Sequence, residues 1–300
     1  MTRTFKIGVQ LPEVERFVPW SELIPMARAA EAVGFDSIWL GDHLLYDLPN
    51  GSVRGPWEVW TSLAAIAAVT TRVEIGPLVA SIGFHEPAML AKQAATVDAI
   101  SGGRLILGLG AGWNEREYRA FGFAFDNRVS RFEEAFGIIR RLLVGEVVDH
   151  DGRFYNVVRG QVDPISRPGG PPLLIGSTAP RMLSIALPHV HAWNVWWSRF
   201  GNTVEGFQRE AEQVAEHCEL AGRVASEVES TAAVYVQVPG GIGRTMGSDA
   251  VVAEPLRGTQ QELAEQLAAF GAAGCAHLQL VVDPITLESI EWLGGVLELL

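Results

Sequence analysis

Short apolar runs alternate with amphipathic segments along the whole chain. The first run, FKIGVQL at residues 5–11, has the apolar and β-branched character of a strand. Residues 20–33 then place apolar side chains at helical spacing, and Gly34 follows as a residue that commonly ends a helix. The same alternation recurs to the last residues, and it predicts eight strand–helix units.

The predicted units define the fold class. We expect strands at residues 5–11, 37–40, 73–80, 105–109, 173–175, 192–196, 231–238 and 277–282. We expect helices at residues 20–33, 57–70, 87–100, 128–143, 180–187, 204–221, 260–272 and 287–300. Almost continuously apolar strands are typical of a parallel sheet covered by helices on both faces. Eight such units predict an α/β protein with a (β/α)8 TIM barrel, because a doubly wound open sheet more often has five or six strands.

One segment interrupts this rhythm. Residues 145–172 contain two short β-type runs around Asp151-Gly152, a pair typical of a type I′ hairpin, and RPGGPP closes the segment. We therefore predict a hairpin-containing insertion after strand four. No composition change calls for a domain boundary, so residues 1–300 are predicted to form one barrel domain.

Composition and charge narrow the function classes. The chain has 300 residues, 48% of them hydrophobic, and a formal net charge of −12, which disfavours nucleic acid and anionic membrane surfaces. Its two cysteines, Cys218 and Cys275, are far apart, so a disulfide framework or a cysteine-based zinc site is not expected. The first residues enter a strand directly and no run reaches eighteen apolar residues, which predicts a cytoplasmic protein without membrane segments.

The second predicted strand ends in a candidate catalytic pair. The run IWLG is followed directly by Asp42 and His43. In a (β/α)8 barrel, the residues that follow the carboxyl ends of the strands form the active site. Histidine exchanges a proton near neutral pH, and an adjacent carboxylate could fix its tautomer. The alternative is an aspartate in a turn beside a histidine bonded to backbone, and the barrel context favours the catalytic interpretation.

Tryptophans gather near the predicted strand ends. Seven of the nine lie at or near such positions: Trp39, Trp57, Trp60, Trp113, Trp193, Trp196 and Trp197. This distribution favours an apolar pocket for a flat ring, although tryptophan is often half-buried elsewhere. We assign Trp57, Trp60, Trp193, Trp196 and Trp197 to a substrate pocket.

Two glycine-containing stretches have different interpretations. Residues 108–112 (GLGAG) are not a dinucleotide fingerprint, because Trp113 stands where the third glycine would be, and we expect these glycines to let the strand pass close to a ligand. In IGSTAPRM, Thr178 can cap the helix that begins at Pro180, and the free backbone N–H groups there could hold an anion with Arg181 nearby. An ordinary capped helix is an equal alternative for this stretch.

No metal site is predicted. His189 and His191 bridge a helix end and a strand without an evident third ligand, and His85-Glu86-Pro87 is interpreted as a turn. Neither a H-E-x-x-H motif, nor a G-x-S-x-G elbow, nor a P-loop occurs.

Four stretches carry a resemblance to a known family: ARAAEAVGFDSIWLGDHLL, AAIAAVTTRVEIGPLVAS, PAMLAKQAATVDAISGGRLILGLGAGWNEREYRAFG and PPLLIGSTAPRMLSIAL. On these residues the chain resembles the bacterial luciferase-like monooxygenase superfamily, and within it the actinobacterial oxidoreductases that depend on coenzyme F420. The resemblance covers nearly the whole chain and is weakest after Gly201.

The resemblance implies a flavin or coenzyme F420 across the barrel mouth, with its phosphate on the loop after strand five. It implies a non-prolyl cis peptide within Val79-Ala80-Ser81 behind the ring, and it matches Asp42 and His43 to the pair beside the ring. The expected cofactor-binding residues are Val79, Ala80, Ser81, Trp113, Asn114, Gly176, Ser177, Thr178, Arg181 and Asn194. The chain departs from the family where Ser177-Thr178-Ala179 replaces glycines, so hydroxyl groups could contact the phosphate.

The predicted function is hydride transfer between coenzyme F420 and a small organic substrate, with His43 as general acid or base and Asp42 orienting it. The alternative within the superfamily is a monooxygenase that uses reduced FMN and oxygen with a partner reductase. A metal-dependent barrel hydrolase lacks the expected strand-end ligand pairs, and a non-catalytic flavin-binding protein remains a further alternative. The resemblance also implies a homodimer formed through the second and third helices.

Overall fold

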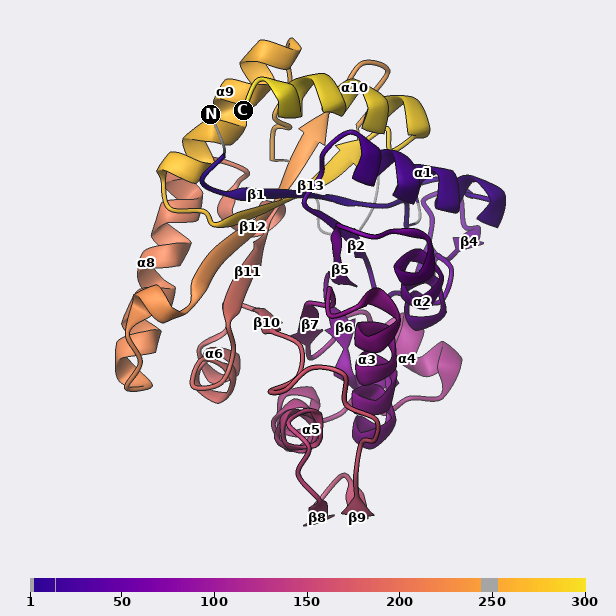
Figure 1. Cartoon of the computed structure of the whole chain (residues 1–300), viewed down its shortest axis with the longest axis vertical. Coiled ribbons are helices and arrows are strands. Elements are labelled where there is room, and N and C mark those ends of the chain that lie inside the picture. The colour runs from indigo at the N-terminus through magenta and orange to yellow at the C-terminus, as the bar shows by residue number, and fades with distance from the viewer. Residues whose placement is uncertain (1–2, 14, 244–252) are drawn as a thin grey trace.

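The computed structural model describes residues 3–13, 15–243 and 253–300. Within these residues, a parallel nine-stranded sheet is wrapped by helices, with strand order β5-β2-β1-β13-β12-β11-β10-β7-β6 (Figure 1). Its strands are β1 (Lys6–Gln10), β2 (Ser37–Leu40), β5 (Glu74–Pro77), β6 (Ala80–Ser81), β7 (Leu107–Gly110), β10 (Leu173–Gly176), β11 (Ala192–Trp196), β12 (Glu229–Gln237) and β13 (His277–Asp283).

The sheet closes because β5 and β6 are two parts of one barrel strand. β5 pairs with β2 and β6 pairs with β7, and the two parts are joined through Leu78 and Val79. A parallel bridge between Ile75 and Leu105 closes the ring, and the N–H of Ile106 donates to the carbonyl of Ile75 at 2.9 Å. The predicted (β/α)8 barrel is confirmed, with the third strand interrupted where the sequence predicted a continuous one.

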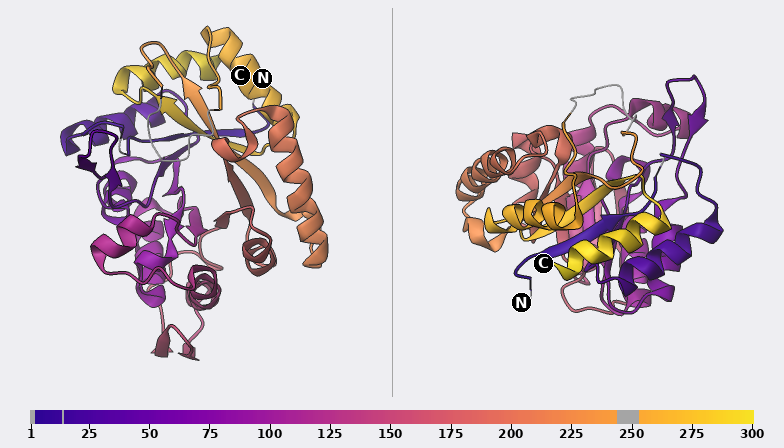
Figure 2. Two further views of the ribbon diagram at one scale, coloured as in Figure 1. Left: turned by 180° about the vertical axis from the view of Figure 1, so that it is seen from behind. Right: turned by 90° about the horizontal axis from the view of Figure 1, so that it is seen from above.

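The helices lie outside the strands, as two further views show (Figure 2). They are α1 (Trp20–Ala32), α2 (Val59–Val69), α3 (Pro87–Ser101), α4 (Glu115–Phe121), α5 (Arg128–Leu143), α6 (Pro180–Ala186), α7 (Trp197–Phe200), α8 (Val204–Leu220), α9 (Gln260–Ala272) and α10 (Leu287–Glu298). Their apolar faces are buried: in α5, Phe132 and Ile139 are fully enclosed. Burial of each such side chain contributes roughly 1.5–3 kcal/mol, so the amphipathic pattern selects the face that packs on the barrel.

Local capping decides where several helices begin and end. α2 begins at Val59 because the carboxylate of Glu58 accepts hydrogen bonds from the N–H groups of Trp60 and Thr61, at 3.0 and 2.7 Å. α3 ends at Ser101, because the next residue, Gly102, has a φ of 69° in the left-handed region that glycine adopts without steric cost. α4 and the short hairpin of β3 (Tyr46–Asp47) and β4 (Val53–Arg54) were not predicted from the sequence.

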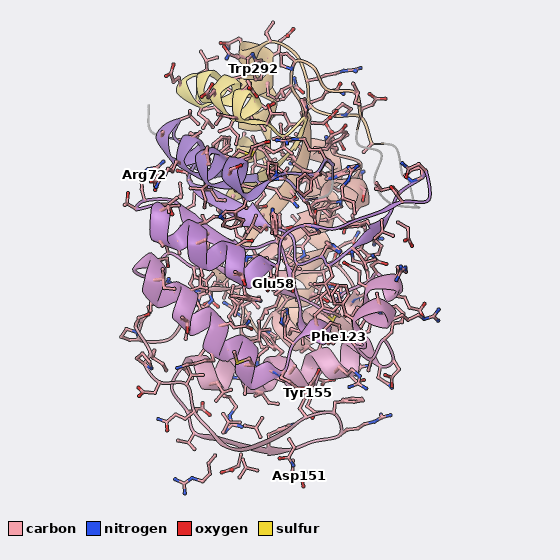
Figure 3. All side chains as sticks on the ribbon, turned by 90° about the vertical axis from the view of Figure 1, so that its right-hand side faces the viewer. Glu58, Arg72, Phe123, Asp151, Tyr155 and Trp292 are labelled. Carbon is pink, nitrogen blue, oxygen red and sulfur yellow. The ribbon has the colours of Figure 1, made fainter. Side chains whose placement is uncertain are left out.

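The predicted insertion contains an antiparallel hairpin of β8 (Val148–Asp151) and β9 (Asn156–Gly160). Asp151 pairs with Asn156, so the connection is a four-residue loop, and the predicted type I′ turn at Asp151-Gly152 is wrong. Asp151 lies at the far end of the hairpin, beyond the stacked helices (Figure 3).

Glu134 of α5 fixes this hairpin to the barrel. Its carboxylate accepts hydrogen bonds from His150 Nε2 at 2.9 Å and from the N–H groups of Phe154 and Tyr155. Burial by itself would raise the pKa of Glu134, but these hydrogen bonds outweigh it and hold the pKa below its ordinary value. The hairpin is therefore a fixed extension on the side of α5.

Among the described residues, none of the helices combines the length and apolar character that crossing a membrane requires.

Candidate functional site

A cavity of about 740 Å³ opens at the carboxyl ends of the barrel strands. Its volume lies within the range of small-molecule sites, and the barrel places it where active sites of this fold occur. Of the residues predicted for the site, the cavity is lined by Asp42, His43, Val79, Ser81, Trp113, Gly176, Ser177, Trp196 and Trp197. Residues from separate strand ends thus meet in one cavity, as the barrel predicted.

One wall of the cavity is built around Val79. The peptide bond between Leu78 and Val79 is cis, one residue before the predicted Val79-Ala80-Ser81 stretch. A Cβ atom on Gly110 would lie 2.8 Å from a methyl group of Val79, and one on Gly176 would lie 2.9 Å from it. These positions require glycine so that the valine side chain fits between the strands. The glycines of β7 therefore accommodate Val79, and since Gly110 also lines the cavity, the close approach of this strand to a ligand stays a prediction.

His43 is surrounded by carboxylates. Its Nδ1–H donates to Glu117, with 3.0 Å between Nδ1 and Oε2, and its Nε2 lies 3.9 Å from Oε1 of Glu13. Tyr46 and Trp113 pack beside the imidazole, with ring centroids at 4.7 and 5.6 Å. Burial by itself lowers the pKa of His43, but the charges of Glu13 and Glu117 and the hydrogen bond to Glu117 raise the pKa above its ordinary value. The imidazole therefore keeps its proton to higher pH than a free histidine.

Glu117 is a site residue that the sequence analysis missed. It lies in α4, its side chain is fully buried, and its Oε1 also accepts the N–H groups of Leu44 and Leu45 at 2.6 and 3.2 Å. The available signal was Asn114, whose side chain caps the N–H of Arg116 and so begins a helix that turns Glu117 inward. The carboxylate holds both the imidazole and the backbone that follows Asp42 and His43.

Glu13 was also missed, although the rule used for the other strands points to it. It follows β1 by three residues, lines the cavity and is buried. Applying the strand-end rule to the first strand would have identified it.

Asp42 does not orient His43, which corrects the predicted role. Its Oδ2 accepts the N–H of Ser81 at 2.8 Å and the Nε2–H of His85 at 2.9 Å. Consecutive side chains after a strand point in different directions, so Asp42 and His43 have separate partners. Asp42 instead ties the end of β2 to β6, and its charge helps to raise the pKa of His43.

Tyr118 contacts Ser81, the residue that Asp42 also holds, and links it to the segment that follows β7. Its phenol donates to the carbonyl of Ala111 at 2.9 Å and lies 3.0 Å from the hydroxyl of Ser81. Burial raises the pKa of Tyr118, so the phenol stays protonated and acts as a fixed donor. Gly112 must be glycine at this point, because its φ of 72° is left-handed and a Cβ would meet the Tyr118 phenol.

Several predicted polar residues lie outside the cavity. Asn114 caps α4, and its amide donates to the carbonyl of Leu45 at 3.3 Å. Asn194 is buried in the barrel interior, where its amide donates to side chains of β12 and β13.

The predicted anion cradle loses two of its residues. Arg181 is paired with Glu133 at 3.0 Å on the outer surface. Thr178 does not cap α6, because the residue that precedes this helix is Ala179. The anion cradle predicted there reduces to Gly176 and Ser177, which line the cavity.

Three predicted tryptophans and Ala80 also lie away from the cavity. Trp57 is 47% exposed and donates its indole N–H to the carbonyl of Val18 at 2.9 Å. Trp60 is buried against His85, and Trp193 is buried in the core. Ala80 is enclosed within β6. Of the predicted tryptophans, Trp113, Trp196 and Trp197 line the cavity, where they join Tyr46, Phe84 and Tyr235 in its aromatic wall.

Within the described ranges, no group of three or more histidine, cysteine, aspartate or glutamate side chains is arranged to hold a metal ion. His191, one of the two histidines considered from the sequence, instead accepts the N–H of Leu173 at 3.1 Å.

Comparison with known proteins places this barrel in a family. A family model described as luciferase-like monooxygenase matches residues 4–239. The chain belongs to this family. The resemblance inferred from the four sequence stretches is thereby confirmed.

Two curated relatives of this luciferase-like chain have assigned activities. A 5,10-methylenetetrahydromethanopterin reductase of Archaeoglobus fulgidus is 33% identical over 182 residues, which are 60% of this chain and 50% of the relative. An F420-dependent glucose-6-phosphate dehydrogenase of Amycolatopsis mediterranei is 34% identical over 181 residues, which are 58% of this chain and 52% of the relative. The chain thus spans about half the length of these curated relatives.

A solved structure agrees in fold. The coenzyme F420-dependent tetrahydromethanopterin reductase of Methanopyrus kandleri superposes with a TM-score of 0.77 at 20% identity, over 97% of each chain. At this identity the likeness establishes the barrel architecture of the luciferase-like chain and nothing further.

Proposed function

We propose that this luciferase-like chain is an oxidoreductase that transfers hydride between coenzyme F420 and a small organic substrate. The single observation that carries the proposal is His43, a histidine with a raised pKa held by Glu117 in a cavity that also has a flat wall. The two curated relatives, a methylenetetrahydromethanopterin reductase and an F420-dependent dehydrogenase, support the choice of hydride transfer over oxygen insertion.

The residues present fit a planar cofactor. Val79, Gly110 and Gly176 form a wall with little side-chain relief, because the glycines leave room for the valine. Trp196 and Trp197 line the cavity as well, with ring centroids 6.2 Å apart, and they supply a broad aromatic surface. Gly176 and Ser177 remain the proposed contacts for the phosphate. When bound, coenzyme F420 supplies or accepts the hydride.

This chain's own residues handle the proton. The Nδ1–H of His43 donates its hydrogen bond to Glu117. Nε2 is therefore the atom that can donate a proton to a substrate oxygen or remove one from it. The raised pKa keeps His43 protonated to higher pH than a free histidine, which favours proton donation to a carbonyl oxygen as the carbonyl is reduced. Tyr46 and Trp113 pack against the imidazole and limit the access of water to it.

Equilibrium binding tests the cofactor assignment. Coenzyme F420 and FMN are titrated separately into the protein, and the absorbance and fluorescence of each cofactor report binding. We expect coenzyme F420 to bind at least about tenfold more tightly, and a panel of ketones to oxidise its reduced form in the presence of the protein. Tighter binding of FMN, together with no oxidation of reduced coenzyme F420 by any ketone, would refute the proposal.

The assembly and the cellular context are further parts of the proposal. We infer a cytoplasmic homodimer that uses α2 and α3, supported by the exposed apolar side chains of Met89 and Ile100 on α3. A separate reductase would regenerate the reduced cofactor. Light scattering of the purified protein tests the dimer, and a monomer at micromolar concentration would contradict it.

A further inference from the structure

Gln10 lines the cavity, and its side chain carries a buried hydrogen-bond acceptor that no described residue uses. It is the last residue of β1, and only 5% of it is exposed. Its Nε2 donates to Oε2 of Glu13 at 3.1 Å. Its Oε1 is buried and has no hydrogen-bond partner among the described residues. Buried acceptors are normally paired, so this oxygen calls for a donor that the surrounding protein does not supply.

Rotation of the amide does not remove this requirement. A half-turn would place the amide oxygen against the carboxylate of Glu13, so that two acceptors would face each other. Glu13 is itself buried, and its Oε1 lies 3.3 Å from the hydroxyl of Tyr46. The carboxylate therefore fixes the orientation of the amide, with the N–H side toward Glu13 and the oxygen left for a ligand.

The charges around this oxygen restrict the ligand further. Glu13, Asp42 and Glu117 are buried carboxylates that line the cavity around His43. Among the described lining residues, Arg257 is the only lysine or arginine. Its side chain is 64% exposed and lies 3.7 Å from the carboxylate of Glu254. A carboxylate or phosphate ester at the Gln10 end of the cavity would therefore meet repulsion from three carboxylates, which the single charge of protonated His43 offsets only in part.

We propose that Gln10 is a specificity-determining residue, whose amide oxygen accepts a hydrogen bond from a hydroxyl group of an uncharged substrate. The amide nitrogen of Gln10 lies 3.1 Å from Oε2 of Glu13, and Nε2 of His43 lies 3.9 Å from Oε1 of the same carboxylate. A hydroxyl bound by the Gln10 amide would therefore lie close to the carbonyl that His43 protonates. The substrate class that fits is an uncharged α-hydroxy ketone, or the corresponding diol in the reverse direction.

This inference rests on the proposed function. Reduction of the ketone consumes one hydride, which reduced coenzyme F420 provides, and one proton, which comes from Nε2 of His43. The carbonyl becomes an alcohol, and the coenzyme is oxidised by two electrons. The hydroxyl that binds Gln10 is unchanged in the reaction, so it acts only in recognition.

Three aromatic ketones of similar size test the proposal: acetophenone, 2-hydroxyacetophenone and phenylglyoxylate. Their binding is measured on the complex with oxidised coenzyme F420, which cannot reduce them, and their kcat/KM is measured with the reduced coenzyme. The variants are Gln10→Met and, as matched control, Gln237→Met. Gln237 also lines the cavity, but its Nε2 already donates to Asp283 at 3.1 Å. Gln10→Asn, which keeps an amide, serves as second variant if Gln10→Met fails to fold.

We expect the parent protein to bind 2-hydroxyacetophenone about tenfold or more tightly than the other two ketones. Gln10→Met should remove the advantage over acetophenone, and Gln237→Met should keep it within about twofold. An unchanged advantage in Gln10→Met would show that the amide oxygen does not bind the substrate hydroxyl, which overturns the proposal. Preferred binding of phenylglyoxylate would overturn the charge argument.

The two measurements separate this inference from the proposed function. If both acetophenone and 2-hydroxyacetophenone are reduced, and Gln10→Met and Gln237→Met change their kcat/KM values alike, the role of Gln10 is overturned and hydride transfer stands. The expected binding pattern without oxidation of the reduced coenzyme by any ketone would support the role of Gln10 in ligand recognition and refute the proposed function.

Discussion

The carboxylate of Glu117 has two roles that different substitutions can separate. It is fully buried, and it accepts hydrogen bonds from His43 Nδ1–H and from the N–H groups of Leu44 and Leu45. Glu117→Leu removes the carboxylate that accepts all three hydrogen bonds and leaves buried donors unpaired, which should lower the free energy of unfolding by about 3–5 kcal/mol. Glu117→Gln keeps one carbonyl oxygen for the 2.6 Å contact with Leu44 but removes the charge, and it should cost about 1–2 kcal/mol.

The pH dependence should change together with stability. Because neighbouring carboxylates raise the pKa of His43, its proton contributes stability that is complete below its ordinary value of 6.5 and is lost as pH rises through the raised pKa. Activity that needs the protonated imidazole falls over the same upper range. Glu117→Gln removes one of the charges that raise this pKa, so the falling limb of kcat/KM should move to lower pH. Its stability deficit against the parent protein should be largest in acid and smaller above the parent's raised pKa.

Denaturant unfolding followed by tryptophan fluorescence measures the first effect, and pH profiles of kcat/KM measure the second. Glu115→Gln is the matched control, since Glu115 lies on the same helix but is paired with Arg119 at the surface, at 2.6 Å. This control should change the unfolding free energy by less than about 0.5 kcal/mol and leave the pH profile in place. If the falling limb of kcat/KM lies at the same pH in Glu117→Gln as in the parent protein, Glu117 does not set the proton affinity of His43. If Glu117→Leu lowers the free energy of unfolding no more than Glu117→Gln does, the hydrogen bonds from the N–H groups of Leu44 and Leu45 contribute little to stability.

Four other substitutions have definite expected outcomes. His43→Ala should lower turnover by about 10²–10⁴ with nearly unchanged affinity for coenzyme F420, and unchanged turnover at saturating cofactor would make it a structural residue. Gly110→Ala places a Cβ 2.8 Å from Val79, so cofactor titration should show affinity weakened by about tenfold, and equal affinity would contradict the proposed wall. Asn194→Leu should lower the unfolding free energy by about 1–3 kcal/mol, with cofactor affinity of the folded protein retained. Trp57→Phe should leave kcat/KM within about twofold, since the side chain lies outside the cavity, and a larger loss would restore it to the substrate pocket.

The barrel could be predicted because its information is local. Each strand is a short apolar run and each long helix repeats apolar residues every three or four positions, so both periods are visible without knowing the partners. The same holds for the hairpin of residues 148–160 as an insertion, although its turn was assigned the wrong length. The failures lie where local signals are weak: α4 has seven residues, and β3 and β4 have two residues each.

The sequence by itself determined that polar residues after the strands would meet at one rim, because parallel strands in a barrel all end on the same side. It identified His43 for this reason, and it could have identified Glu13. Only the tertiary structure decided which side chains face the cavity and which partners they find. Asp42 turns toward Ser81 and His85, while His43 receives Glu117 from a helix far along the chain. Trp57 and Trp193 follow the same strand-end pattern as Trp196, yet only Trp196 lines the cavity, because side-chain direction depends on packing between elements that are distant in sequence.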